Sequence, residues 1–338
     1  MRFVIYGAGG VGGTIGARLH LRGFSVILVA RGEHGRVLQR QGMRFIAPEG
    51  SQTLNIPTVL HPGEIEFQPD DVVLLTMKSQ HTAGALEDLL TANPGDVGVV
   101  CSQNGVANER MALRRFKRVY GMLINLPAQH LIPGEVLSFG AGTSGILDTG
   151  RFPHGLDDTT IELCSALSSS GFVAEPDAKI MRKKYAKLIL NLGNALEAAT
   201  NRADVREIGR VLELEARACY VAAGIECADA GEIDARRRNA YQFVALPGRP
   251  RFGGSTWQSI DRGTRNVETD YLNGEIVQLG RIYGVPTPAN EVCQQLGQRM
   301  VRDGLPVGHF SVADIEAMIA CRTASTSPKA NRNKGCVL

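Results

Sequence analysis

The sequence has no hydrophobic run that approaches the ~20 residues a membrane-spanning helix needs. It also has no large excess of one charge, because 37 Lys and Arg against 34 Asp and Glu leave a net charge of +3. No basic run is interleaved with aromatic residues, so the electrostatic footprint of a nucleic-acid-binding protein is missing. We therefore expect neither a membrane nor a nucleic acid as partner.

Paired cysteines are missing as well. The seven cysteines lie at 101, 164, 219, 227, 293, 321 and 336, and no two have the C-x-x-C or other spacing of a zinc site. An odd, scattered set is typical of buried thiols in a reducing compartment and predicts no metal centre. The first strand begins at residue 2, leaving no room for a signal peptide, and Cys336 lies too close to the end for a prenylation box. We expect a soluble cytoplasmic protein.

The largest uninterrupted basic clusters are two short triplets, Arg182-Lys183-Lys184 and Arg236-Arg237-Arg238. Small charge clusters usually lie on a solvated helix face, and we interpret both in that way. The 338 residues exceed what one ordinary core holds, so two domains are expected.

The first half of the chain alternates between strand and helix patterns. An N-terminal strand is followed by predicted strands at 25–31, 71–78, 97–104 and 118–123, and by predicted helices at 11–22, 33–41, 80–91 and 107–115. A hairpin insert at 43–60, a Gly-rich meander at 124–150, a helix at 157–170 and a strand at 172–175 complete this half. Such alternation favours a parallel, doubly wound α/β sheet of the Rossmann type.

Strand patterns stop near residue 178. Helical patterns cover 178–199, 204–224, 230–245, 264–283 and 289–303, so the second domain is predicted to be all-helical. We predict a dinucleotide-binding domain over 1–176, a helical substrate domain over 177–322, and a disordered polar tail over 323–338.

The strongest motif is the glycine series Gly7, Gly9 and Gly12, spaced as G-x-G-x-x-G between the first strand and helix. The first glycine allows the tight turn, the second lets the backbone approach a pyrophosphate, and the third allows close helix–strand packing. The helix then offers free N–H groups to phosphate. We predict that the loop Gly7, Ala8, Gly9, Gly10, Val11 and Gly12 binds a dinucleotide; the alternative is glycines that serve packing alone.

Arg31 ends the second strand, where such folds usually carry an acid for the ribose hydroxyl. Its planar guanidinium suits a phosphate monoester. We therefore predict NADP(H) as the cofactor, with an exposed loop arginine as the alternative.

Two polar residues end buried strands, Lys78 at the end of 71–78 and Asn104 at the end of 97–104. Ligands of open α/β sheets bind outside the carboxyl ends of the strands, so both are candidate site residues. Because Asn-Gly is also a turn dipeptide, Asn104 has a structural alternative.

The segment 179–200 carries a polar stripe on an otherwise apolar helix. Lys187, Asn191 and Asn194 fall in one sector, and the remaining circumference is occupied by Leu188, Ile189, Leu190, Leu192 and Leu196. A helix that is apolar nearly all round is buried, so the stripe must face a polar cavity or ligand, unless the lysine reaches the surface along its own stem. A lysine could protonate an alkoxide or bind a carboxylate. Candidate partner acids are Glu268, Asp270 and Glu275.

The chain resembles the ketopantoate reductases over roughly residues 1–305. The resemblance is carried by GAGGVGG at 7–13, Arg31, MK at 77–78, QNG at 103–105, KLILN at 187–191 and the long segment ETDYLNGEIVQLGRIYGVPTPAN at 268–290. It implies a Rossmann domain followed by a helical domain, as in 6-phosphogluconate dehydrogenase. It also implies NADPH-dependent reduction of ketopantoate (2-dehydropantoate) to pantoate, for pantothenate and coenzyme A synthesis.

The resemblance also implies roles for single residues. Lys187 resembles the general acid, and Glu268 the acid that contacts the substrate hydroxyl near the cofactor. Asn104 and Asn191 resemble residues that place substrate and nicotinamide, and Lys78 resembles a lysine near both. The family's second asparagine falls at position 195, which is alanine here, so the neighbouring Asn194 is the substrate-binding candidate. For the serine that binds the substrate carboxylate, Ser255 and Thr256 remain alternatives.

The sequence departs from the family pattern in two places, at 194–198 and at 124–140, and both changes affect the predicted substrate pocket. Two rival functions therefore stay open: a reductase or dehydrogenase of another keto or hydroxy acid, and an NADP(H)-binding regulator without turnover. The sequence does not give the oligomeric state, and a homodimer stays open.

Overall fold

The computed structural model describes residues 1–93, 97–249, 253–263 and 266–326. The chain forms two compact units. The N-terminal unit comprises Met1–Ala186 and Ala228–Arg251, and the helical unit comprises Lys187–Cys227 and Phe252–Leu338. The predicted domain division at 176/177 stays a prediction, and of the predicted tail 323–338 only residues up to 326 lie within the described part.

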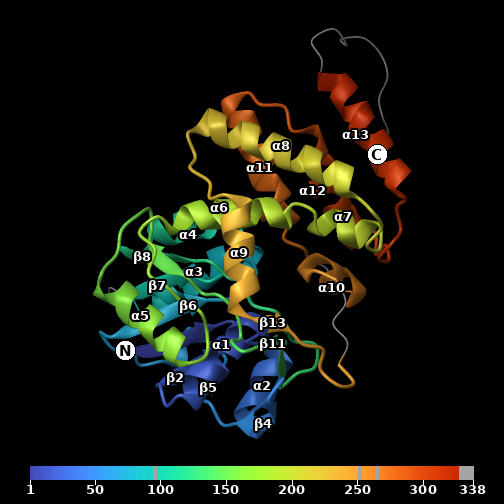
Figure 1. Ribbon diagram of the computed structural model, residues 1–338. Coiled ribbons are helices and arrows are strands. Elements are labelled where there is room, and N and C mark those ends of the chain that lie inside the picture. The colour runs from blue at the N-terminus through green and yellow to red at the C-terminus, as the bar shows by residue number, and fades with distance from the viewer. Residues whose placement is uncertain (94–96, 250–252, 264–265, 327–338) are drawn as a thin grey trace. The chain divides into compact units, whose positions relative to one another are not determined.

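A seven-stranded sheet forms the centre of the N-terminal unit, in the order β12-β8-β7-β6-β1-β2-β5 (Figure 1). Its strands are β1 (Arg2–Tyr6), β2 (Val26–Val29), β5 (Thr58–Val59), β6 (Asp71–Leu75), β7 (Gly98–Cys101), β8 (Arg118–Met122) and β12 (Thr149–Arg151). All neighbours pair in parallel except β12, which runs antiparallel to β8. The predicted doubly wound α/β sheet is thereby confirmed.

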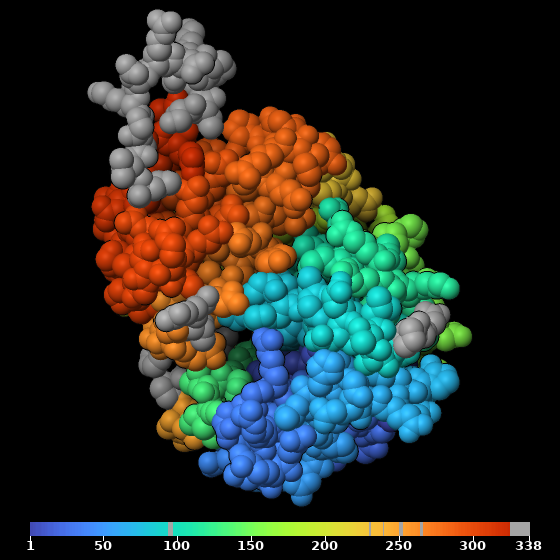
Figure 2. All heavy atoms as spheres, turned by 180° about the vertical axis from the view of Figure 1, so that it is seen from behind, coloured from blue at the N-terminus to red at the C-terminus, as the bar shows by residue number. Residues whose placement is uncertain are grey.

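Side chains that alternate along β1 divide the unit into two cores. Phe3 and Ile5 pack on one face with α1 (Gly10–Leu21) and α5 (Asp158–Ser169), whereas Val4 packs on the other with α3 (Thr82–Ala92) and α4 (Asn108–Leu113). Figure 2 views the molecule from behind, with α3 and α4 in cyan and turquoise. This burial on both faces is why the strands read as continuous apolar runs.

A second, four-stranded sheet covers α1. It consists of β4 (Gly50–Leu54), β3 (Met43–Ala47), β10 (Glu135–Ser138) and β9 (Ala128–Gln129), in that order. The β3–β4 pair is the hairpin predicted within 43–60, and α2 (Gly32–Gln41) precedes it. The predicted strand at 172–175 is wrong, because Val173 forms only an isolated bridge to Ile146.

The segment predicted as one helix over 230–245 is α9 (Ala230–Ala240), followed by the short strand β13 (Gln242–Phe243), which pairs with β11 (Gly140–Ala141). Arg236 of α9 binds the buried Asp148 through Nε at 2.7 Å and Nη2 at 2.6 Å. This segment therefore returns the chain to the N-terminal unit.

The helical unit contains no strand among its described residues, but the wider stretch 177–322 that was predicted to be all-helical also includes β13. Its helices are the end of α6 (Ile180–Asn191), α7 (Asn194–Ala199), α8 (Arg206–Ala223), α10 (Ser255–Asp261), α11 (Asn273–Tyr283), α12 (Pro288–Arg302) and α13 (Val312–Thr326). Helices α10 and α13 were not predicted from the sequence. Within the described ranges, no helix has the length and apolar character needed to cross a membrane.

Candidate active site

The glycine loop has the geometry of a phosphate-binding turn. Gly7 has φ +110°, a conformation that side-chain-bearing residues rarely adopt, and a Cβ there would lie 2.8 Å from the Met77 nitrogen. A Cβ on Gly12 would overlap the Thr76 hydroxyl, whereas one on Gly9 would meet nothing within 4 Å. Gly7 and Gly12 are thus required by packing, and the space at Gly9 leaves room for a ligand to approach the backbone.

Helix α1 begins directly after Gly9 and has no acidic residue in its first turn. The first N–H groups of an α-helix have no partner within the helix, and the helix dipole favours an anion there. This end of α1 can therefore receive the pyrophosphate of a dinucleotide.

His34 of α2 is hydrogen-bonded to the glycine loop. Its Nε2 donates to the Ala8 carbonyl at 2.7 Å, and its Nδ1 accepts from the Gly134 N–H at 2.9 Å. Burial, followed by the nearby His130, lowers the pKa of His34 to about 4, so the ring stays neutral and keeps this pair of hydrogen bonds. The sequence analysis missed His34, since no motif marks it.

A pocket of about 320 Å³ lies where β1, β2 and β6 end. Gly7 and Arg31 both line this pocket, together with Met77, Gln80 and His81. Burial, with Arg31 and Lys78 nearby, lowers the pKa of His81. Arg31 is exposed at the start of α2, as its predicted role at a phosphate requires.

Gln80 gives this pocket a second polar feature that the sequence analysis missed. Both polar atoms of its side chain are buried, and neither has a hydrogen-bond partner within the part of the chain that the structure describes. Buried amide groups normally have hydrogen-bond partners, so the two unpaired atoms of Gln80 indicate that a polar ligand binds there. The pocket, Arg31 and the free end of α1 together fit NADP(H).

The prediction that Lys78 and Asn104 end their strands is wrong, because β6 already ends at Leu75 and β7 at Cys101, and both residues lie in the loops that follow. Lys78 is half-buried and precedes the short 3-10 turn η2 (Ser79–His81). The Asn104 carbonyl accepts from the Asn108 side chain at 3.3 Å, which fixes the loop. The Asn104 side-chain oxygen, however, is buried without a partner among the described residues, and is therefore available to a ligand.

Helix α6 ends at Asn191, which corrects the prediction of one continuous helix over 178–199. A 3-10-type hydrogen bond from Leu192 N to Ile189 O closes it, and α7 starts at Asn194. Lys187 and Asn191 share a face at i, i+4 spacing, but Asn194 belongs to the next helix. The buried Asn191 Nδ2 has no partner in the described chain. The expected all-round burial is also wrong, because Leu190 is 50% exposed.

Asn194 lies beside the start of α10 within the helical unit. The Gly254 N–H donates to Glu197 at 2.9 Å, and a Cβ on Gly254 would lie 3.4 Å from the Asn194 oxygen. Of the two carboxylate-binding candidates, Ser255 is half-buried and Thr256 is buried. The structure thus brings Asn194, Ser255 and Thr256 into one region.

Glu268 is buried and precedes the 3-10 turn η3 (Thr269–Tyr271). Of the other two candidate acids, Asp270 accepts from Gln294 at 2.7 Å, and Glu275 is buried at the start of α11. The described residues contain no cluster of His, Cys, Asp or Glu that could hold a metal ion.

The prediction that both basic triplets face solvent is wrong for three of their six residues. Lys184 is buried, with Nζ 2.5 Å from the buried Glu109. Lys183 binds Asp148 and Asp177 at 3.1 and 2.9 Å, and Arg236 binds Asp148. Local sequence could not reveal these partners, because each carboxylate lies on a distant segment.

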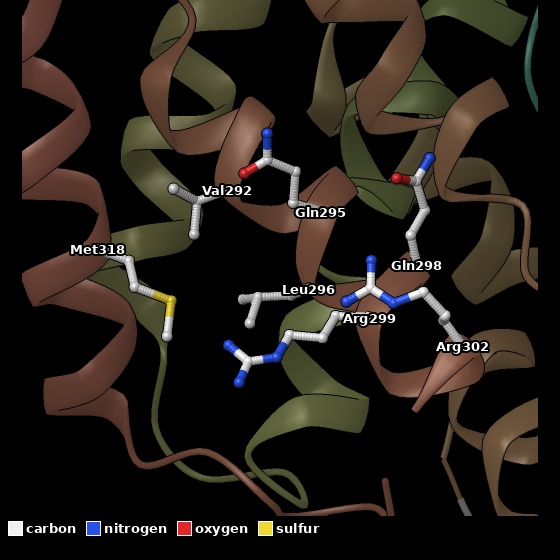
Figure 3. Close-up of a pocket in the computed structure, with 7 residues that line it drawn as sticks. All are labelled: Val292, Gln295, Leu296, Gln298, Arg299, Arg302 and Met318. Carbon is white, nitrogen blue, oxygen red and sulfur yellow. The ribbon is translucent and has the colours of Figure 1, made fainter. Parts of the chain in front are cut away.

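A separate pocket of about 280 Å³ in the helical unit carries none of the predicted residues. Figure 3 shows Arg299 and Arg302 of α12 with Met318 of α13 on its lining. Both arginines lie beside Asp303, at 3.6 and 2.8 Å, so their charge is already compensated. We do not assign this pocket to the active site.

A doubly wound sheet with this glycine turn, and with an arginine where an acid would bind the ribose, defines a Rossmann-type protein that binds NADP(H). The model of the family "Ketopantoate reductase PanE/ApbA" matches residues 3–152, and the model of its C-terminal part matches residues 179–300. The chain belongs to the ketopantoate reductase family, whose members are NADP-dependent oxidoreductases.

Two relatives are similar in sequence to this chain over most of its length. A 2-dehydropantoate 2-reductase of Archaeoglobus fulgidus is 27% identical over 314 residues, covering 90% of this chain and 99% of the relative. One from Pyrococcus horikoshii is 27% identical over 308 residues, covering 86% and 94%.

Two solved structures show how widely this fold is shared. A PanE/ApbA family ketopantoate reductase from Ralstonia eutropha JMP134 is 28% identical, with a TM-score of 0.76 over 90% of this chain and 99% of the other. A D-mandelate dehydrogenase with NADH and anilino(oxo)acetate has a TM-score of 0.78 over the same shares of the two chains, at 23% identity. The latter likeness shows the fold alone.

Proposed function

We propose that this chain reduces a 2-keto acid with NADPH, and that the acid is ketopantoate, which places the enzyme in pantothenate synthesis. The observation that carries the proposal is the joining of Gly7 and Arg31 in one pocket, within a chain that both family models match. The relatives named 2-dehydropantoate 2-reductase support the choice of acid.

In this proposal, separate residues bind the cofactor and donate the proton. NADPH supplies the hydride when bound. The glycine loop from Gly7 to Gly12 holds the pyrophosphate and Arg31 binds the 2′-phosphate, while Lys78 lies near cofactor and substrate. Lys187 donates the proton to the carbonyl oxygen, because a lysine ammonium suits general acid catalysis of alkoxide formation.

The remaining candidates orient the substrate. The unsatisfied amides of Asn104 and Asn191 are free to hydrogen-bond a keto acid. Glu268 contacts the hydroxyl that forms, and Asn194 lies next to the carboxylate-binding hydroxyl. Comparing Ser255→Ala with Thr256→Val decides that hydroxyl: the variant with the larger rise in KM for the acid identifies it.

A substrate panel tests the proposal. NADPH oxidation is measured with ketopantoate, with phenylglyoxylate (the keto acid of mandelate) and with short 2-keto acids. Fold alone does not select among these, since a D-mandelate dehydrogenase shares it. We expect the highest kcat/KM for ketopantoate. A higher value for another acid would replace the substrate, and NADPH binding without turnover on any acid would favour a regulator.

We further propose a homodimer formed through α8. Val211, Leu214, Ala218 and Val221 follow a 3-4-3 spacing on one face of this helix, and Leu214 and Val221 are 67% and 83% exposed. A solved relative from Staphylococcus aureus is described as a dimeric ketopantoate reductase. Sedimentation should give a dimer for the wild type and for Ile161→Glu on α5, but a monomer for Leu214→Glu/Val221→Glu. A monomeric wild type would contradict the proposal.

A further inference from the structure

Lys184 is a buried lysine that the proposed mechanism does not use. Its side chain is 2% exposed, and the Glu109 side chain is fully buried, with Nζ and Oε1 2.5 Å apart. A buried ammonium is costly unless it is paired and fully hydrogen-bonded. Lys184 meets that condition, because Nζ also donates to the carbonyls of Cys101 at 3.2 Å and Gln103 at 3.1 Å.

The two carbonyls lie on either side of the end of β7. Cys101 is the last residue of that strand, and Gln103 directly precedes Asn104. The loop is also held on its other side, because the Asn104 carbonyl accepts from Ser79 at 3.4 Å and from Asn108 at 3.3 Å. The backbone around Asn104 is thereby fixed, while its side-chain oxygen stays unsatisfied.

Lys184 also belongs to the helix that carries the proposed general acid. It lies on α6, one turn before Lys187 and two turns before Asn191. Glu109 lies in the first turn of α4, immediately after the loop. One ion pair thus joins the Asn104 loop, α4 and the catalytic helix.

We infer that Lys184 and Glu109 form a positioning pair. The pair fixes the Gln103–Gly105 loop against α6, in the arrangement that the reaction needs. The inference rests on the roles proposed for Asn104 and Lys187. Neither residue of the pair is among the proposed substrate contacts. Their effect is to set where Asn104 and Lys187 lie.

The test separates positioning from stability. Lys184→Met alone leaves a buried carboxylate unpaired and lowers stability. Lys184→Met/Glu109→Met removes both charges and keeps an apolar core, which buried pairs tolerate well. The matched control is Arg2→Met/Asp71→Met, which removes a bidentate pair of 2.6 Å bonds to a buried carboxylate at the amino-terminal ends of the central strands β1 and β6.

The double variant Lys184→Met/Glu109→Met is expected to keep its unfolding midpoint within a few degrees of wild type. Its kcat for the keto acid should fall about 10- to 100-fold, since small misplacements of reacting groups are costly. The KM for NADPH should stay unchanged, because the two substitutions do not alter β1, α1 or Arg31. Amide hydrogen exchange at 102–105 should accelerate, and the control should change neither kcat nor that exchange.

Unchanged kcat and exchange in Lys184→Met/Glu109→Met would overturn the inference, as would equal losses in the control pair. Should the wild type reduce no 2-keto acid, the proposed function fails. The exchange comparison still decides whether the pair holds the loop.

Discussion

Single residues decide the cofactor and the chemistry proposed for this chain. The glycine turn, the start of α1 and the place of Arg31 after β2 could be predicted from sequence, because all three are local features; the ligand roles of these residues stay predictions. His34, Gln80 and Lys184 could not be predicted, since their importance lies in partners or in missing partners that only the fold reveals.

Arg31 is expected to set the preference for NADPH. Arg31→Ala should raise the KM for NADPH about 10- to 100-fold, the usual worth of a hydrogen bond to a charged group, and leave the KM for NADH nearly unchanged. Arg36→Ala is the control, because Arg36 is an exposed residue on the same helix that binds Glu33. Equal losses for both cofactors would refute the role at the 2′-phosphate.

His34 is expected to make the protein acid-sensitive. Its pKa is about 4 when folded, against about 6.5 in an unfolded chain. Between these values the unfolded state binds more protons, so the stability present above pH 6.5 is lost as the pH falls towards 4.

His34→Gln keeps a neutral donor and acceptor at this position. The free energy of unfolding, measured in urea from pH 7 to 4, should therefore decline less steeply for His34→Gln than for the wild type. His154→Gln, at an exposed position, is the control for removing a histidine. Parallel curves for wild type and His34→Gln would rule the effect out.

At the scale of elements, the sheet was predictable, but the end of α6, the helix of the proposed general acid, was not. Continuous apolar strands and regular helix spacing place β1, β2, β6, β7 and β8 correctly. The break between α6 and α7 escaped prediction, because apolar periodicity runs on through Leu192. What stabilises the break is Asn273, whose Nδ2 donates to the Leu192 carbonyl at 3.0 Å.

Asn273 is therefore expected to hold the end of α6 in place. It also donates to Asn290 at 3.1 Å, and Glu215 accepts from the Asn290 side chain at 2.8 Å. Asn273→Ala would leave buried groups unsatisfied, which should cost about 2–4 kcal/mol of stability in urea unfolding. Gln298→Ala, which loses only an exposed bond, should stay within about 0.5 kcal/mol of wild type.

At the scale of the whole molecule, the chain returns to its N-terminal unit after entering the helical one. The sequence indicates helix at 230–245 but not its destination, because the contacts of α9 are long-range. Arg236 reaches Asp148, and Arg249 reaches Glu135 at 2.8 Å. The segment Ala228–Arg251 is thereby part of the N-terminal unit.

The triplet at 236–238 allows a matched test of this return. Arg236→Met leaves the buried Asp148, within the described residues, with Lys183 as its ion-pair partner and the Glu175 N–H as a neutral donor, and should lower the free energy of unfolding by about 3 kcal/mol. Arg238→Met changes an exposed residue of the same helix and should have little effect. Equal stability of the two variants would contradict the structural role of Arg236.

The most direct measurement is the steady-state rate of NADPH oxidation with ketopantoate, for the wild type and for Lys187→Ala, with the exposed Lys179→Ala as control. The account predicts turnover by the wild type and by Lys179→Ala, and a kcat at least about 100-fold lower for Lys187→Ala. A wild type that does not oxidise NADPH with ketopantoate, or a Lys187→Ala variant that keeps the wild-type kcat, would contradict it.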